Sequence, residues 1–253
     1  MAIAYSYPDI AKMIDHSLLN PALTVPELDA GCQLAHLFDV ASVCILPYYV
    51  ARCAEILAGS TVQPSTTIGF PHGGHATAVK LSEAQQALHD GATELDMVIN
   101  ISQARSGNWD YVTREIGLLS HATHDAGAKI KVIFENTYLE DPAKIRLCEI
   151  CGEIGVDWVK TSTGYASSGA TLADLALMRR HAPPTVQVKA AGGIRTAKDA
   201  IRYLVLVNET AGEDWLDPRW FRLGASSLLN DLLMQRSKQL TGAYAGPDYF
   251  TLD

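Results

Sequence analysis

The sequence predicts an α/β fold of one domain, a single (β/α)8 TIM barrel that spans residues 1–253. Short β-rich runs alternate with helical patterns along the whole chain at intervals of roughly 25–35 residues, which is typical of repeated βα units. Eight such units fit in 253 residues, and barrels of this kind occupy about 250 residues as one domain. No low-complexity linker or shift in composition divides them.

Eight β-rich runs are the predicted strands. An open, doubly wound sheet would also alternate strands and helices, but no GxGxxG motif follows the first run, so we favour the closed barrel. The runs are Ile14–His16, Val40–Leu46, Ser65–Phe70, Glu94–Ile99, Ile130–Glu135, Asp157–Thr161, Val186–Ala190 and Trp220–Leu223.

Capping signals place helices between these runs. The segment Thr24-Val-Pro-Glu27 has the pattern of a capping box, and Thr171 and Thr196 have the chemistry of N-cap residues. Glycines follow three helical patterns where a positive φ commonly ends a helix: Gly91, Gly127 and Gly155. After the last helix, residues 241–253 show no helical periodicity and are expected to form a C-terminal tail.

Composition indicates a soluble globular protein and excludes several other classes. Hydrophobic residues make up 48% and charged residues 19% of the chain, enough apolar surface for a large core. The net charge of −8 and the lack of a basic run argue against nucleic acid as a partner. No stretch approaches the ~20 apolar residues that a membrane span needs, and no signal peptide is evident. We therefore expect no membrane partner and a cytoplasmic location.

Five cysteines are too few, and odd in number, for a disulfide framework. Cys148 and Cys151 have the C-x-x-C spacing, but they lie in a helical pattern with no second Cys or His pair to complete a zinc site. The pairs His72/His75 and His121/His124 lack a third ligand nearby and are interpreted as loop or surface histidines. No metal site is expected.

Charged residues alternate with apolar ones along four predicted strands. The runs that show this are Glu94-Leu-Asp-Met-Val98, Lys131-Val-Ile-Phe-Glu135, Trp158-Val-Lys160 and Gln187-Val-Lys189. Because side chains alternate between the two faces of a strand, apolar residues that face the helices leave the charges pointing into the barrel. Burying such charges is costly unless they are paired, so they are candidates for a function.

Asp96, Lys160 and Lys189 lie at or near the C-terminal ends of strands 4, 6 and 7, where barrel enzymes build their active sites. A neighbouring ammonium and partial desolvation both lower the pKa of a lysine, which makes its amine able to attack a carbonyl. The alternative is a structural ion network in which both lysines pair with Asp96, Glu94 or Glu135. Charge placement alone does not decide between the two interpretations.

Two glycine-containing loops predict a phosphate site. Gly192 and Gly193 follow strand 7, and Gly224-Ala-Ser-Ser227 follows strand 8, the position of many barrel phosphate sites. Glycines let the backbone approach a ligand closely, and Ser226 and Ser227 can offer hydroxyl and N–H groups. Each loop alone could be an ordinary tight turn, but both together favour phosphate binding.

Seven short motifs, in order from residue 14 to residue 227, resemble those of the deoxyribose-phosphate aldolase family, whose members are class I, Schiff-base-forming aldolases. The motifs are Ile14-Asp-His-Ser-Leu-Leu19, Val43-Cys44, Ile68-Gly-Phe-Pro-His-Gly73, Glu94-Leu-Asp-Met-Val98, Val159-Lys-Thr-Ser-Thr-Gly164, Val188-Lys-Ala-Ala-Gly-Gly-Ile-Arg-Thr196 and Leu223-Gly-Ala-Ser-Ser227.

The resemblance implies a role for each matching residue. Lys160 would form the Schiff base, Lys189 would depress its pKa, and Asp96 would act as acid–base partner through a water molecule. The residues implied to line the pocket or hold the substrate are Asp15, Cys44, Thr163, Gly164, Gly192, Gly193, Ser226 and Ser227.

The implied reaction is reversible cleavage of 2-deoxy-D-ribose 5-phosphate to acetaldehyde and D-glyceraldehyde 3-phosphate, with no metal or organic cofactor. Small phosphorylated sugars and aldehydes would be the partners, and a homodimer is expected because family members often form one. The alternatives are another Schiff-base barrel aldolase with a different donor or acceptor, and a non-catalytic barrel that binds phosphosugars.

Two tyrosines depart from the family pattern. In some members a C-terminal tyrosine reaches the active site, but here Tyr249 is not the last residue, so its role does not follow directly. Tyr165 stands where some relatives have a lysine that contacts the substrate phosphate. A neutral phenol in that position predicts weaker discrimination in favour of phosphorylated substrates.

Overall fold

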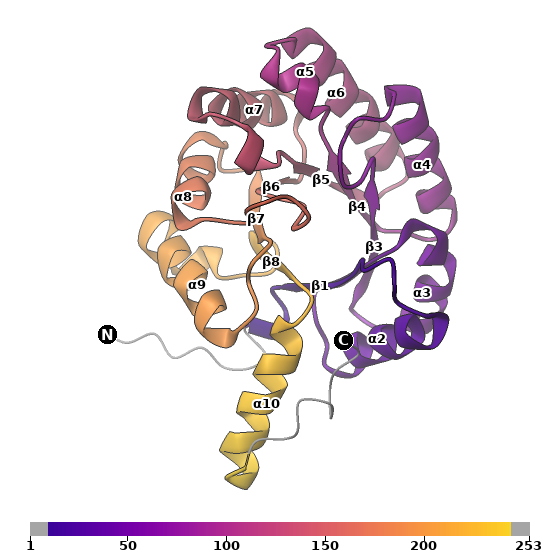
Figure 1. Cartoon of the computed structure of the whole chain (residues 1–253), viewed down its shortest axis with the longest axis vertical. Coiled ribbons are helices and arrows are strands. Elements are labelled where there is room, and N and C mark those ends of the chain that lie inside the picture. Colours follow the sequence, from indigo (N-terminus) through magenta and orange to yellow (C-terminus); the bar gives the residue numbers. More distant parts are fainter. Residues whose placement is uncertain (1–9, 244–253) are drawn as a thin grey trace.

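A computed structural model describes residues 10–243, and in them eight parallel strands close into a barrel. Each strand pairs with its neighbour in sequence, and β1 (Ile14–Leu18) closes the barrel against β8 (Phe221–Ala225). Figure 1 shows the strands at the centre with the helices arranged around them. The predicted (β/α)8 barrel is confirmed.

The other strands are β2 (Ser42–Ile45), β3 (Gln63–Ile68), β4 (Glu94–Val98), β5 (Lys129–Ile133), β6 (Trp158–Lys160) and β7 (Gln187–Ala191). The α-helices are α2 (Val25–Leu37), α3 (Val50–Leu57), α4 (Thr77–His89), α5 (Ile101–Arg105), α6 (Trp109–Asp125), α7 (Asp141–Ile154), α8 (Leu172–His181), α9 (Ala197–Ala211) and α10 (Leu228–Thr241).

The eight predicted strands all form, and no bound differs from the prediction by more than two residues. The differences have local causes. Strand β3 stops before Phe70 because Gly69 takes a positive φ of 65°. Strand β5 stops before Glu135 because this residue also has a positive φ, 57°, which is rare for a residue that has a Cβ atom.

The predicted helix caps are present. Glu27 accepts a hydrogen bond from the backbone N–H of Thr24 at 2.6 Å, which is one half of the capping box at the start of α2. The side chain of Thr171 accepts from the backbone of Asp174 at the start of α8, and a capping box at Thr196 begins α9. The three predicted glycines have φ values of 98°, 73° and 81°, in the order Gly91, Gly127 and Gly155.

The hydrophobic core lies between the barrel and the helices. Outward residues of the strands, such as Leu95, Val132 and Val159, are buried against the helices. Cys148 and Cys151 are free thiols buried in this layer on α7, as the sequence suggested. No helix among residues 10–243 is long and apolar enough to span a bilayer. The apolar layer lies outside the strands, which leaves the polar residues inside the barrel.

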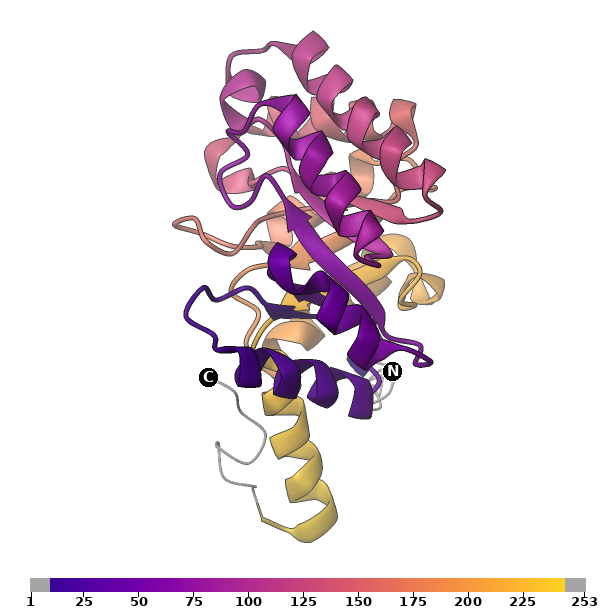
Figure 2. The ribbon, with the colours of Figure 1, turned by 90° about the vertical axis from the view of Figure 1, so that its right-hand side faces the viewer.

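Helix α10 extends away from the barrel, as Figure 2 shows at right angles to Figure 1. Its first half is anchored by buried leucines, among them Leu229 and Leu233, whereas Leu240 near its end is 74% exposed. The helix ends at Thr241, so the first residue of the predicted tail is helical. Tyr249 and the rest of residues 244–253 lie outside the part of the chain that the structure describes.

A buried ion pair ties two outer helices to the end of β4. Lys80 of α4 and Glu115 of α6 lie 3.0 Å apart, and both side chains are fully buried. Lys80 also donates to the carbonyl of Val98 at 2.8 Å, and Glu115 accepts from the backbone N–H of Asn100 at 2.9 Å. Burial holds the pKa of Lys80 below its ordinary value, although Glu115 opposes this effect.

We expect Glu115→Leu to lower the free energy of unfolding by about 3–5 kcal/mol, because it leaves the Lys80 ammonium buried without a counter-charge. The double variant Lys80→Met/Glu115→Leu should regain most of this loss, since replacing both partners with apolar residues is often neutral. Urea denaturation of the three proteins measures the effect. A double variant no more stable than Glu115→Leu would contradict it.

Candidate active site

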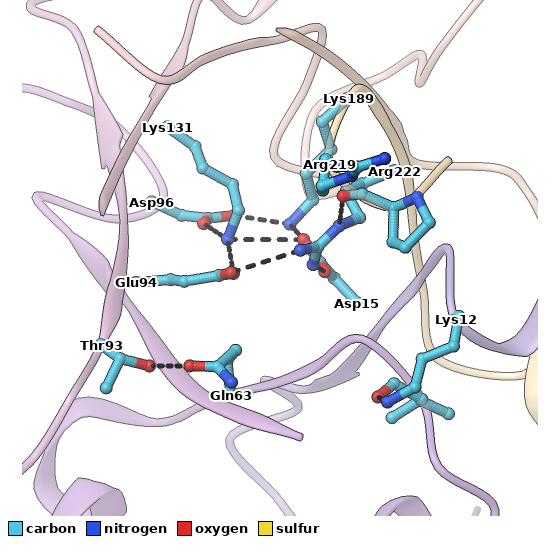
Figure 3. Close-up of polar contacts among 12 residues, drawn as sticks. Lys12, Asp15, Gln63, Thr93, Glu94, Asp96, Lys131, Lys189, Arg219 and Arg222 are labelled. Atoms are coloured by element: carbon cyan, nitrogen blue, oxygen red, sulfur yellow. Dashed lines mark hydrogen bonds and ion pairs between the residues drawn. The ribbon is translucent and has the colours of Figure 1, made fainter. Parts of the chain in front are cut away.

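Charged side chains from six neighbouring strands meet inside the barrel, and Figure 3 shows most of them from one side. We call this set the interior network. All its members are buried, and each points inward from a strand. They are Asp15 of β1, Glu94 and Asp96 of β4, Lys131 of β5, Lys160 of β6, Lys189 of β7 and Arg222 of β8.

Asp96 lies at the centre of the interior network. One of its carboxylate oxygens, Oδ2, accepts hydrogen bonds from Lys160 at 2.7 Å and from Lys189 at 2.8 Å. The other, Oδ1, accepts from Lys131 at 2.9 Å. The two lysines that the sequence predicted to meet therefore share one carboxylate oxygen, and a third lysine binds the opposite side.

A second tier of ion pairs lies nearer the N-terminal ends of the strands. Asp15 accepts from Arg222 at 2.7 Å and forms an ion pair with Lys189. Glu94 lies 2.6 Å from Lys131 and 3.4 Å from Arg222. Both lysines thus pair with Asp96 in a buried ion network, which is the arrangement that the structural interpretation of the sequence expected. Membership in a network does not exclude a chemical role.

Electrostatics distinguish Lys160 from the other lysines of the network. Its pKa is lowered, chiefly by burial and then by the ammonium of Lys189, while Asp96 opposes the change. The pKa values of Lys131 and Lys189 are raised, because carboxylates outweigh their burial. Asp96 has a pKa below its usual range, since three lysines outweigh its own burial. Lys160 is therefore the amine of this network that gives up its proton most readily.

A cavity of about 290 Å³ opens above Lys160 at the C-terminal ends of the strands. Lys160 is 3% exposed, and this exposed part faces the cavity. The loops after β1, β6, β7 and β8 form the walls. Residues that line it include His16, Asn20, Thr163, Gly164, Tyr165, Gly192, Gly193, Arg195, Ser226 and Asn230.

Glycine is required where the loops after β6 and β7 touch. Gly192 has a φ of 85°, and a Cβ atom there would lie 2.9 Å from Cα of Gly169 and 3.1 Å from Cα of Gly164. Both gaps are shorter than a normal contact, so a side chain would push the loops apart. The glycines thus shape the wall of the cavity and leave its backbone accessible to a ligand.

The structure brings most of the candidate residues together. Lys160, Thr163, Gly164, Gly192, Gly193 and Ser226 line the cavity. Asp15, Asp96 and Lys189 lie beneath it with no exposed surface, and Cys44 is buried beside them. Burial, more than the charge of Asp96, raises the pKa of the Cys44 thiol to about 11. Ser227 does not line the cavity and instead occupies the N-cap position of α10.

Glu135 positions the loop that follows β6. Its carboxylate accepts hydrogen bonds from the backbone N–H and the hydroxyl of Thr163. The left-handed backbone conformation of Glu135 directs the side chain towards that loop. Its pKa is raised by burial, although the bonds from Thr163 oppose this. Sequence analysis placed Glu135 in the charged series of a strand and missed this contact.

Other residues of the site were not singled out in the sequence. Arg195 and Asn230 face the cavity, and neither Asn230 Oδ1 nor His16 Nδ1 has a hydrogen-bond partner among the described residues. Burial lowers the pKa of His16 to about 4, so its ring is neutral at pH 7. Arg222 alternates with apolar neighbours in β8, a signal that could have indicated its inward position.

The histidine pairs lie outside the interior network. His72 and His75 are exposed, His121 lies 3.2 Å from Asp125, and His124 lies 2.8 Å from Asp157. Within residues 10–243, no group of three or more His, Cys, Asp or Glu side chains could hold a metal ion.

A family model described as DeoC/LacD family aldolase matches residues 10–234. A deoxyribose-phosphate aldolase from Rhodopirellula baltica is 65% identical over 191 residues, which cover 76% of this chain and 79% of that protein. A deoxyribose-phosphate aldolase from Thermococcus gammatolerans is 46% identical over 195 residues, 76% of this chain and 87% of that protein.

Solved structures give the same relationship. The structure of a putative deoxyribose-phosphate aldolase from Coccidioides immitis superposes with a TM-score of 0.82 and 33% identity, covering 92% of this chain and 88% of that one. The tetrameric deoxyribose phosphate aldolase from Aeropyrum pernix has a TM-score of 0.79 and 30% identity, with coverage of 92% and 93%.

We expect Lys189→Leu to raise the pKa of Lys160, because it removes a nearby positive charge that disfavours the Lys160 ammonium. A lysine nucleophile works only when neutral, so activity rises with pH as it loses its proton. A higher pKa therefore moves the acid limb of the kcat/KM profile to higher pH. Lys198→Ala, which removes an exposed lysine, is the control. An acid limb that stays in place in Lys189→Leu would show that the two lysines are not coupled.

Proposed function

The chain belongs to the DeoC/LacD aldolase family, and we propose that it reversibly cleaves 2-deoxy-D-ribose 5-phosphate to acetaldehyde and D-glyceraldehyde 3-phosphate through an imine on Lys160. The observation that carries this proposal is the position and the lowered pKa of Lys160. Lys160 faces the cavity, and its pKa is lowered while those of Lys131 and Lys189 beneath it are raised. An amine whose pKa is lowered, and which faces a cavity, is the nucleophile that imine chemistry requires.

The reaction begins at the aldehyde carbon of the open-chain sugar. The neutral Lys160 amine attacks this carbon, and loss of water gives a positively charged iminium. Asp96 lies 2.7 Å from Lys160 Nζ, so its carboxylate stabilises the positive charge as it forms. This charge draws electrons from the bond between the α and β carbons of the sugar. An imine thus supplies the electron sink, and no step needs a metal or an organic cofactor.

Cleavage follows when the hydroxyl beside that bond loses its proton. The bond breaks, the phosphorylated aldehyde leaves, and an enamine stays on Lys160. Protonation of the enamine carbon and hydrolysis of the resulting iminium release acetaldehyde and restore the amine. We propose that Asp96 and Lys189, which are joined at 2.8 Å, move these protons through a water molecule in the cavity.

The phosphate would bind at the far wall of the cavity. Gly164, Gly192 and Gly193 expose backbone there, and Ser226 adds a hydroxyl. The sequence suggested mainly neutral donors, but Arg195 also lines this wall and adds a positive charge. Ser227 would contribute through the N-terminus of α10.

The two alternatives differ in their products. Another Schiff-base aldolase would share the imine and release a different aldehyde, which product analysis identifies. A non-catalytic phosphosugar-binding barrel would form no imine. One domain over the whole chain and a homodimer remain predictions, and the tetrameric relative makes self-association a reasonable expectation.

We expect Lys160→Ala to abolish turnover and to remove the adduct that borohydride forms in the presence of acetaldehyde, because only an imine is reduced to a stable amine. Circular dichroism should show an intact fold. Mass spectrometry of the trapped peptide identifies the lysine, and Lys198→Ala should trap as the wild type does. An adduct on a different lysine would overturn the assignment.

Tyr165 tests the phosphate site. Its hydroxyl donates to the backbone carbonyl of Leu19 at 2.7 Å, its ring packs edge-on against Phe70, and it lines the cavity. We expect Tyr165→Lys to raise the ratio of kcat/KM for deoxyribose 5-phosphate over deoxyribose by about tenfold, since a charged contact is worth roughly 1.5–3 kcal/mol and a neutral one about 1.

The matched control is Tyr165→Phe, which loses the same bond to Leu19 without adding a charge. Its ratio should stay near that of the wild type. If the ratio is flat or lower in Tyr165→Lys, this position does not contact the phosphate.

A further inference from the structure

The interior network holds one more positive charge than negative charge when every group is ionised. Its anions are Asp15, Glu94 and Asp96, and its cations are Lys131, Lys160, Lys189 and Arg222. In a buried cluster a surplus charge is costly, because water cannot solvate it. One cation therefore has a reason to lose its proton.

The contacts show which cation is least compensated. Lys131 lies within ion-pair distance of three carboxylates, and Lys189 and Arg222 each lie near two. Among residues 10–243, Lys160 forms an ion pair with Asp96 alone, and it shares that carboxylate oxygen with Lys189. Arginine does not deprotonate in proteins, so Arg222 is a permanent member of the set. If one cation of the network gives up its proton, Lys160 is the one that loses the fewest ion pairs.

We propose that Arg222, which enters from the opposite end of the barrel, is the positioning residue that makes Lys160 the surplus cation of the network. Its guanidinium binds Asp15 at 2.7 Å and lies 3.4 Å from Glu94. These two carboxylates are thereby compensated without Lys160. Without Arg222, three lysines would face three carboxylates, and all three lysines would be needed as ammonium ions.

The surroundings fix Arg222 in this position. Its Nε donates to the carbonyl of Pro218, and its guanidinium lies over the ring of Trp158 with 5.4 Å to the centroid. It also borders a separate cavity at the N-terminal mouth of the barrel, beside Lys12, Lys129 and Arg219. Arg219 forms an ion pair with Asp217 there at 2.9 Å. The mouth thus offers a neighbouring arginine as a matched control.

Two other titratable groups near Lys160 form no ion pair with it. Cys44 on β2 has a raised pKa and is neutral at pH 7. Glu135, in the loop after β5, interacts electrostatically with Lys160, but its carboxylate is bound by Thr163 and the two side chains form no ion pair. The charged groups that remain are the members of the network on β1, β4, β5, β7 and β8.

The test measures the protonation of Lys160 directly. The inference rests on the proposed function, since Lys160 matters as the nucleophile of that function. The measurement itself needs no turnover. Trace acetylation with acetic anhydride at a series of pH values labels a lysine in proportion to its neutral fraction, and mass spectrometry of the Lys160 peptide gives the apparent pKa. A failed imine trap would reject the proposed function, whereas the labelling curve decides the role of Arg222.

The variants Arg222→Met and Glu94→Gln should shift the labelling curve of Lys160 in opposite directions. Arg222→Met should raise the apparent pKa of Lys160 by about one pH unit, the shift that Coulomb's law gives for any unit charge about 10 Å distant at an effective dielectric constant of about 20. Glu94→Gln should lower it, because it removes an anion and no cation. The double variant Arg222→Met/Glu94→Gln should return close to the wild type, and Arg222→Lys should stay there.

Arg219→Met removes a charge from the same mouth and should leave the curve unchanged. The proposal is overturned if Arg222→Met leaves the pKa in place or lowers it, or if Glu94→Gln raises it. If Arg222→Met does not fold, Glu94→Gln and the double variant decide the question, because a general loosening of the barrel would shift both in the same direction.

Discussion

The rest of this molecule depends on the hydrogen bonds that the Asp96 carboxylate accepts from three lysines. Its two oxygens bind lysines from three different strands, which only a closed barrel can bring to one point. An open sheet would leave β1 and β8 on separate edges, and Asp15 could not meet Arg222. The closure of the barrel and the charge state of its interior are therefore one requirement, and the apolar layer between strands and helices supplies the stability that permits it.

The structural and the chemical interpretations of the lysines prove compatible. A buried ion network is costly to assemble, but its fixed charges cannot reorient as water does. A nucleophile placed at the edge of such a network, and open to a cavity on one side, experiences a constant electrostatic environment. Burial and the ammonium of Lys189 lower the pKa of Lys160, and the same network holds Asp96 ready to face a positive nitrogen. Ground-state structure and proposed reactivity then arise from one arrangement.

Much of the fold and of the site could be predicted from the sequence, because strand alternation and loop composition indicate them. Alternation along the strands placed Asp96, Lys160 and Lys189 inside the barrel, and loop chemistry after strands 7 and 8 indicated the cavity wall. The pairing of charges could not be predicted. Arg222 and Asp15 are 207 residues apart, and their contact depends on the stagger of the closed barrel. Nor does any propensity indicate a left-handed Glu135, whose conformation its contact with Thr163 stabilises.

The charged interior has a consequence for the dependence of stability on temperature. Hydration of ions carries a strongly negative entropy, so the cost of removing charged groups from water falls as the temperature rises. Hydrophobic stabilisation of the layer outside the strands levels off over the same range. The interior of this barrel, with Asp96 and its three lysines shielded from solvent, is therefore least costly in warm conditions. An interior built from salt bridges is therefore penalised least at the temperatures where apolar packing alone stops improving.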